Sequence, residues 1–194
     1  MGSDAGFEEA LIRYKDLVLR WNKRIALVSR KTPRESLNRL IRHSLEGEAM
    51  LPKGIERVMD VGSGAGFPGV LIAMKRPETR VELVERSERK SIFLREVKRT
   101  LGLRNAEVIQ ESFVPSMMEG TNRTALTAMA VGEYGKLALS VAERMKEGQG
   151  LLLFVAEKVA LRIAEEAGFS VKRWEKLSGR DRTGVAWLEK MAAI

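Results

Sequence analysis

A glycine-rich run directly after an apolar segment carries the clearest chemical signal in this sequence. It reads Asp60-Val61-Gly62-Ser63-Gly64-Ala65-Gly66 and follows Val58 and Met59. Glycine has no Cβ, so it permits both a positive φ and a close approach of a ligand to the backbone. Enzymes that use S-adenosylmethionine (SAM) hold this cofactor with an acidic residue followed by such a run. We therefore predict a SAM-dependent methyltransferase.

The same residues also match the dinucleotide-binding fingerprint Gly64-x-Gly66-x-x-Gly69. Asp60 discriminates between the two ligands, because a carboxylate would repel a pyrophosphate and attract the sulfonium and ammonium groups of SAM. Glu85 ends the next apolar run and suits the two ribose hydroxyls of either ligand. A strand-to-helix turn without a ligand is the remaining alternative. The ordered series of strand, glycines, helix start at Pro68 and spaced acid favours a binding site.

Composition narrows the chemistry further. The chain has 194 residues, 44% of them hydrophobic and 31% charged, which suits one globular domain with a small appendage. It has no cysteine and a single histidine, His43, so we expect no metal site, no thiol nucleophile and no Ser-His-acid triad. The lack of cysteine also argues against pyrimidine C5 methylation. No apolar run approaches the length of a membrane span, and the first residues do not show the pattern of a signal peptide. We therefore expect a cytoplasmic protein, and we expect it to be a monomer.

Positive charge is concentrated near the N-terminus. The net charge is +8, and the segment from Arg20 to Arg42 holds eight Lys or Arg residues against one acid, Glu35. This segment is a candidate surface for nucleic-acid phosphates, with a set of solvated helix faces as the alternative. Further basic clusters lie within 86–104 and 172–182, and the sequence does not decide their role.

Two helices are expected ahead of the glycine run. Apolar residues spaced by three and four, from Phe7 to Trp21, predict an amphipathic helix with its aromatic stripe in the core. The string Thr32-Pro33-Arg34-Glu35 predicts a capping box at the start of a second helix that ends near Met50. We therefore divide the chain into a basic N-terminal helical extension, residues 1–54, and a methyltransferase domain, residues 55–194.

Strand-like and helical segments alternate after residue 54, which is typical of a parallel α/β sheet. The predicted fold is α/β: a Rossmann-like class I SAM-dependent methyltransferase with a mostly parallel seven-stranded sheet and a terminal antiparallel hairpin. The expected strands are 57–61, 80–85, 106–110, 124–128, 151–155, 170–177 and 183–191, and the expected helices are 68–75, 88–101, 133–146 and 157–167. Ligands bind beyond the carboxyl ends of the strands in such sheets.

Several strings together resemble one family. They are Trp21-Asn22-Lys23, Arg42-His43, the glycine run extended to Phe67-Pro68-Gly69, and Phe93-Leu94-Arg95-Glu96-Val97. The chain resembles the RsmG family, also called glucose-inhibited division protein B (GidB), over most of its length. The resemblance implies a bacterial enzyme that methylates N7 of a guanosine in small-subunit (16S) ribosomal RNA with SAM. Its partner would be that RNA or the small ribosomal subunit, and S-adenosylhomocysteine would be its product.

The resemblance also implies roles for individual residues. The glycine turn, which comprises Gly62, Ser63, Gly64 and Gly66, would contact the amino-acid end of SAM. Glu85 would contact its ribose, and Ser112 and Phe113 its adenine. His43 matches a histidine that the family carries in its second helix, although a lone histidine is more often structural. No catalytic residue is assigned. The full predicted cofactor site comprises Asp60, Gly62, Ser63, Gly64, Gly66, Phe67, Glu85, Arg86, Ser112, Phe113 and Met129. The predicted RNA-binding residues are Lys23, Arg24, Arg30, Lys31 and Arg34.

This sequence departs from the family pattern on the side expected to face the target base. Met129-Ala130-Val131-Gly132 stands where the family usually has Arg-Ala-x-Ala, and Ser112 and Val114 replace an arginine and a glutamate. Glu46-Gly47 and Ala156-Glu157 are further departures. One alternative is therefore a catalytically degenerate member that binds cofactor or ribosomal RNA as an assembly or regulatory factor. Methylation of a small molecule on the same fold is another.

Overall fold

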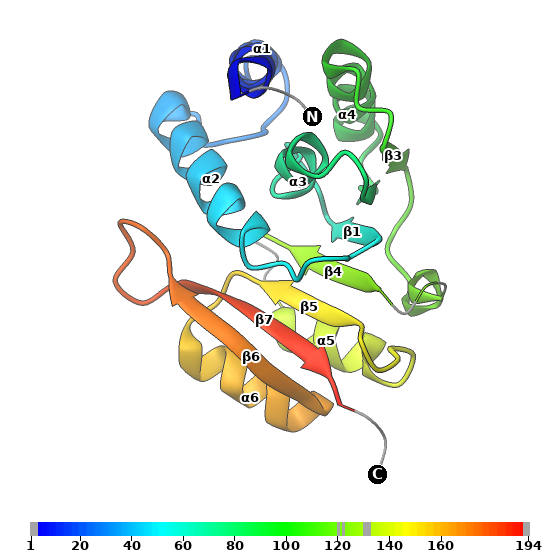
Figure 1. The fold of residues 1–194 in the computed structure, drawn as a ribbon. Helices are drawn as coiled ribbons and strands as arrows, with labels where there is room; N and C mark the ends of the chain where they lie inside the picture. Colours follow the sequence, from blue (N-terminus) through cyan, green and yellow to red (C-terminus); the bar gives the residue numbers. More distant parts are fainter. Residues whose placement is uncertain (1–3, 120, 122, 130–132, 192–194) are drawn as a thin grey trace.

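Seven strands form one sheet in the computed structural model, which describes residues 4–119, 121, 123–129 and 133–191 (Figure 1). The order is β3-β2-β1-β4-β5-β7-β6. The first five strands are parallel, and β7 runs antiparallel to both β5 and β6. This arrangement confirms the predicted class I methyltransferase fold with its terminal hairpin. The strands are β1 (Arg57–Val61), β2 (Arg80–Val84), β3 (Ala106–Ile109), β4 (Thr124–Ala128), β5 (Gly150–Leu153), β6 (Phe169–Lys176) and β7 (Gly184–Lys190).

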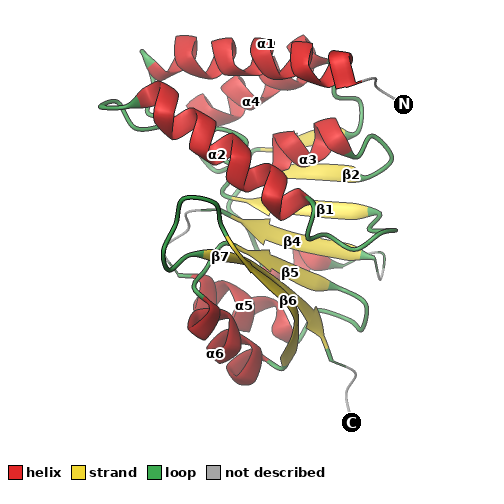
Figure 2. Cartoon of the chain, turned by 60° about the vertical axis from the view of Figure 1, so that its left-hand side comes forward, coloured by secondary structure: helices red, strands yellow, loops and turns green. Residues whose placement is uncertain are grey.

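Helices cover both faces of the sheet (Figure 2). Successive strand residues point to opposite faces, so Val58 enters one core cluster and its neighbour Met59 the other. The first cluster lies under α1 (Asp4–Asn22), α2 (Pro33–Glu48), α3 (Gly69–Lys75) and α4 (Glu88–Leu101), and the second under η1 (Pro115–Met118), α5 (Tyr134–Ala142) and α6 (Glu157–Ala167). No helix in the described part of the chain is long and apolar enough to cross a membrane.

The N-terminal helices pack directly on the rest of the chain. Trp21 Nε1 donates to Glu96 of α4 at 2.9 Å, and Arg20 donates to the same carboxylate at 3.0 Å. The Trp21 ring also meets Phe93 edge to face, with 5.8 Å between ring centroids. The core cluster that contains Tyr14 of α1 also contains Val58 of β1. Residues from both sides of the predicted boundary near residue 54 therefore share one core. The division into two segments stays a prediction.

Two local expectations are wrong. The capping box does not form, because the Thr32 hydroxyl lies 3.3 Å from the Ser36 hydroxyl instead and no side chain caps the first amides of α2. Helix α5 ends at Ala142, whereas the expected end is residue 146. The side chain of Gln149 accepts a hydrogen bond from the Lys146 amide at 3.0 Å, and such a local bond competes with helical pairing.

Candidate functional site

The predicted cofactor residues follow four neighbouring strands. Val61 pairs with Val84, and Val84 with Ile109, while Asp60 pairs with Thr127. The carboxyl ends of β3, β2, β1 and β4 therefore lie level with one another. This register brings the glycine turn, Glu85, the segment 111–113 and Met129 to one edge of the sheet, which we call the catalytic edge.

Hydrogen bonds within the protein fix the glycine turn. The amides of Gly62 and Ser63 both donate to the Val84 carbonyl, at 2.8 and 3.1 Å, and the Gly66 amide donates to Ser63 O at 2.6 Å. Gly62, Gly64 and Gly66 have φ values of 70°, 56° and 95°. These values lie in the left-handed region, which residues with a Cβ rarely adopt. The turn is thus shaped by the chain itself.

The glycines of this turn and Gly69, the first residue of α3, serve two different purposes. A Cβ at Gly66 would overlap Val70 and come within 3.2 Å of Tyr14 Oη, and a Cβ at Gly69 would come within 2.6 Å of Asp60 Oδ2. These two glycines face the core. A Cβ at Gly64 would meet only Gly62 O, at 3.6 Å, so this position faces the open side of the catalytic edge. The backbone at Gly64 is therefore accessible from this side, which fits its predicted contact with SAM.

Glu85 supports the turn from the end of β2. Its Oε2 accepts from the Gly64 amide at 2.9 Å and its Oε1 from the Ser87 amide at 2.8 Å, with the residue 6% exposed. Each carboxylate oxygen has a second lone pair, so these bonds leave acceptor capacity for the two ribose hydroxyls. The contact with the ribose stays a prediction, and the free acceptor positions of Glu85 fit it.

Asp60 lies beneath the turn rather than on its open side. It is 0% exposed, its Oδ2 accepts from the Gly69 amide at 3.2 Å, and its Oδ1 has no hydrogen-bond partner. Burial raises the pKa of Asp60 to about 8. The side chain is therefore mainly neutral at pH 7, unlike the charged carboxylate assumed from the sequence. Its predicted contact with SAM stays a prediction.

Tyr14 contacts the glycine turn, although the sequence places it only in a packing stripe. Its hydroxyl donates to the Ala65 carbonyl at 2.6 Å, and its ring meets Phe67 edge to face, with 5.6 Å between centroids. Burial, and then the charge of Asp60, raise the pKa of Tyr14 well above its usual value, so it keeps its proton. A buried tyrosine hydroxyl needs a hydrogen-bond partner. This requirement was the signal from which a polar contact of Tyr14 could have been expected.

The other predicted cofactor residues differ in exposure. Phe67 is buried, while Arg86 and Ser112 are exposed. Phe113 packs on the second core cluster and Met129 on the first, both partly buried. Residues 130–132, where the sequence departs from the family, lie outside the described residues. In the part of the chain that the structure describes, no group of three or more His, Cys, Asp or Glu could hold a metal ion.

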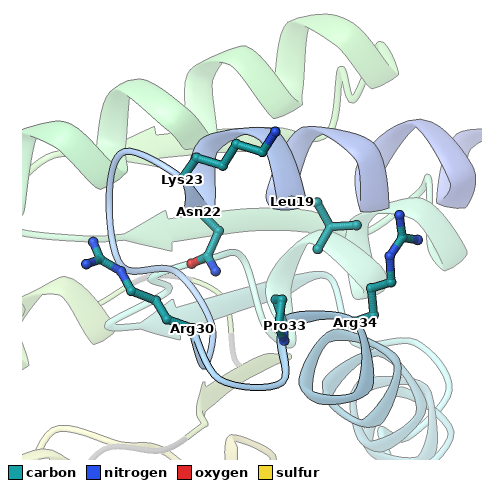
Figure 3. A pocket seen from close by; sticks show the side chains of 6 residues that line it. All are labelled: Leu19, Asn22, Lys23, Arg30, Pro33 and Arg34. Atoms are coloured by element: carbon teal, nitrogen blue, oxygen red, sulfur yellow. The ribbon is translucent and has the colours of Figure 1, made fainter.

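The five predicted RNA-binding residues, here called the basic corner, lie between the end of α1 and the start of α2. Lys23, Arg30 and Arg34 line a hollow of about 430 Å³ together with Leu19, Asn22 and Pro33 (Figure 3). Arg24 and Lys31 are exposed but do not line this hollow. Within the described residues none of the five forms an ion pair, so their charges are open to an external partner.

Asn22 holds the backbone of this corner. Its Oδ1 accepts from the amides of Leu27 and Val28 at 2.9 and 3.0 Å, and the residue is buried. The loop between α1 and α2 is thus fixed at its middle, which keeps the flanking cations on the outer surface. Sequence reasoning found the cations and missed this support, because an asparagine after a helix is also compatible with a plain turn.

Comparison with known proteins identifies the family. The sequence model of the GidB family, described as rRNA small subunit methyltransferase G, matches residues 7–178. The chain belongs to the GidB family. It is therefore a SAM-dependent methyltransferase of small-subunit ribosomal RNA. Ribosomal RNA small subunit methyltransferase G of Xanthomonas oryzae pv. oryzae is 35% identical over 149 residues, which cover 77% of this chain and 69% of that protein. Its namesake in Nitrosospira multiformis is 41% identical over 116 residues, 59% of this chain and 50% of that protein.

Solved structures agree on the fold. A SAM-dependent methyltransferase from Aquifex aeolicus superposes with a TM-score of 0.61 at 18% identity, covering 93% of this chain and 98% of that chain. A mutant of MtNAS in complex with SAM gives a TM-score of 0.63 at 15% identity, covering 94% and 72%. At these identities the likeness supports the class I architecture, and the family match carries the activity.

Proposed function

We propose that this chain transfers the methyl group of SAM to N7 of a guanosine in 16S ribosomal RNA. The observation that carries the proposal is the family match together with a preformed glycine turn at the catalytic edge. Gly64 opens that turn toward a ligand, and Glu85 offers acceptors beside it. The basic corner supplies unpaired cations for the RNA phosphates.

Each part of the chain has a defined task in this reaction. When bound, SAM supplies an electrophilic methyl group on its sulfonium. The glycine turn and Glu85 would orient the cofactor, and Tyr14 holds the turn in place through Ala65. Guanine N7 carries a lone pair and no proton, so transfer needs orientation and no general base. This chemistry accounts for a site in which no catalytic acid or base is assigned.

The proposal also covers the location, the partner and the oligomeric state of the protein. We expect the protein to act in the cytoplasm, with either free small-subunit RNA or the assembled small subunit as its partner. We expect it to act as a monomer, because the catalytic edge is formed by strands of one chain. Sedimentation at micromolar concentration tests this expectation, and a stable dimer would contradict it.

Single-turnover transfer tests the proposed function. Small subunits from a strain that lacks the modification are mixed with excess enzyme and methyl-labelled SAM, and the labelled base is then identified by mass spectrometry. We expect one methyl group per subunit, on guanine N7. Transfer to another atom would refute the N7 assignment. SAM binding without transfer would instead support the degenerate family member, for which the absence of the usual arginine at Met129 is the motivating observation.

A further inference from the structure

The loop between β6 and β7, residues 177–183, lies at the catalytic edge. Strand β7 is antiparallel to β5 and to β6, so β6 runs in the same direction as β5. Leu153 of β5 and Trp174 of β6 both pair with Ala186, which sets the ends of these strands level. The β6–β7 loop therefore projects from the same edge as the glycine turn.

This loop is fastened to helix α2. The Ser178 carbonyl lies 3.1 Å from His43 Nε2, and the Ser178 amide donates to Glu46 Oε2 at 3.3 Å. His43 is 4% exposed, and its Nε2 must carry the proton because a carbonyl oxygen only accepts. Burial lowers the pKa of His43, so a neutral imidazole makes this bond. Figures 1 and 2 show the loop directly beside α2.

Three arginines belong to this junction, Arg42 on α2 and Arg180 and Arg182 in the loop, and we call them the arginine arm. All three are exposed, and within the described residues none of them forms an ion pair. The guanidinium of Arg42 lies 3.6 Å from the Cβ position of Gly179, so α2 and the loop share one surface. The acids nearby are Glu46, which bonds the Ser178 amide, and the exposed Asp181.

A line of hollows between α1 and α2 connects the basic corner to the arginine arm. The hollow at the corner shares Leu19 and Arg34 with a second one of about 240 Å³. That hollow shares Lys15 and Asn38 with a third, of about 690 Å³, which is lined by Arg42. Asp16 and Glu46 are the acids along this path, and the cations outnumber them.

We propose that the arginine arm is a second RNA-binding surface, which binds backbone phosphates of the same RNA as the basic corner. Guanidinium groups match phosphate oxygens in a bidentate geometry, so an RNA backbone is the partner that fits three unpaired arginines. The substrate would then be held at two places beside the catalytic edge, joined by α2. His43 is a positioning residue in this arrangement because it holds the loop that carries Arg180 and Arg182. The inference rests on the proposed function only in taking RNA as the substrate.

A double substitution with a charge-matched control tests the arm. Arg180→Ala with Arg182→Ala is compared with Lys172→Ala with Arg173→Ala, which removes the same charge from β6 residues that are ion-paired with Glu189 and Glu175. Binding to protein-free 16S RNA is measured between 50 and 200 mM KCl. We expect the arm variant to lower the slope of log K against log salt by about 0.9 for each phosphate that the two arginines bind. The control is expected to keep the parental slope, and both variants to bind SAM as the parent does.

The outcomes separate this inference from the proposed function. Equal slopes for the arm variant and the control would overturn the arginine arm. A conservative variant, Arg180→Lys with Arg182→Lys, retains both charges and should keep most of the slope, whereas a decrease equal to that of the alanine variant would point to a disturbed loop and count against phosphate binding. If the parent failed to methylate small subunits while the arm variant still lowered the salt slope, the proposed function would fail and the arginine arm would stand.

Discussion

The glycine turn and the basic corner are built in opposite ways. In the turn, the amides of Gly62, Ser63, Gly64 and Gly66 all donate within the protein, and the supporting carboxyl groups are buried. In the corner, one buried asparagine holds the backbone, and five cations have no ionic partner in the described chain. A small, rigid cofactor requires a preformed surface. A large polyanion requires accessible charge, so side chains that stay solvated are sufficient there.

The largest expected effect lies in the core-facing part of the turn. Gly66→Ala should lower the free energy of unfolding by about 3 kcal/mol, because it combines left-handed strain with overlap on Val70. Gly102→Ala is the matched control, since Gly102 has a φ of 66° and nothing within 4 Å of its Cβ position. The control should be destabilised by only about 1 kcal/mol. Urea denaturation measures both, and equal destabilisation would show that packing around Gly66 is unimportant.

Glu85 tests the ligand-facing part of the same turn. Glu85→Gln keeps the shape but replaces one acceptor with a donor, which conflicts with the Gly64 or the Ser87 amide. We expect SAM binding to weaken by about 2 kcal/mol, on the scale of charge-assisted hydrogen bonds. Glu78→Gln, an exposed change outside the catalytic edge, is the control and should leave affinity unaltered. Calorimetric titration decides, and parental affinity in the Glu85 variant would remove this residue from the site.

The buried carboxyl group predicts a pH dependence of stability. The pKa of Asp60 in the folded protein, about 8, lies above its ordinary value of 3.8, so the folded state binds more protons than the unfolded state between these values. Stability from this group is complete below pH 4 and is lost as pH rises through 8. Unfolding measured from pH 4 to 9 should show this decline in the parent and a flatter profile in Asp60→Asn. Identical profiles would place the titration elsewhere.

Substitutions in the basic corner should change the salt dependence of RNA binding and leave SAM binding unchanged. Lys23→Ala with Arg24→Ala should weaken RNA binding and lower the salt slope by up to about 1.8, the value for two bound phosphates. Arg144→Ala with Arg162→Ala removes the same charge from residues with acidic partners, Glu119 and Glu166, and serves as the control. Filter binding across a KCl series measures both. A slope equal to that of the control would assign Lys23 and Arg24 to a solvated surface.

The smallest effect on SAM affinity is expected for Tyr14, because it contacts the glycine turn from α1, the helix that leads to the basic corner. Tyr14→Phe removes only the hydroxyl that donates to Ala65, and should lower SAM affinity about fivefold, equivalent to about 1 kcal/mol. Ser140→Ala removes an exposed hydroxyl of α5 that bonds Leu137 O and is the control. An unchanged SAM affinity in the tyrosine variant would limit Tyr14 to a packing role.

Patterns local in sequence predicted most of the fold. The positions of β1, β4, α4 and α6 are confirmed as expected, because hydrophobic periodicity acts within one element. The predicted end of α5 was wrong because the Gln149 side chain accepts a hydrogen bond from the Lys146 amide. Hydrophobic periodicity gives no information about such a bond. In the candidate site, the spacing of the glycine residues indicated the turn. The tyrosine hydroxyl on Ala65 and the burial of Asp60 depend on how α1 packs on the turn, which no spacing in the sequence reveals.

A calorimetric titration with SAM of the parent, Gly64→Ala, and the Lys23→Ala, Arg24→Ala double variant tests the central claim most directly. Gly64 faces the open side of the turn, so an added methyl group there should block the cofactor, whereas the basic corner should be dispensable for it. We predict saturable binding to the parent and the double variant, with little or none to Gly64→Ala. Parental affinity in Gly64→Ala, or no binding to the double variant, would contradict the division of tasks between the glycine turn and the basic corner.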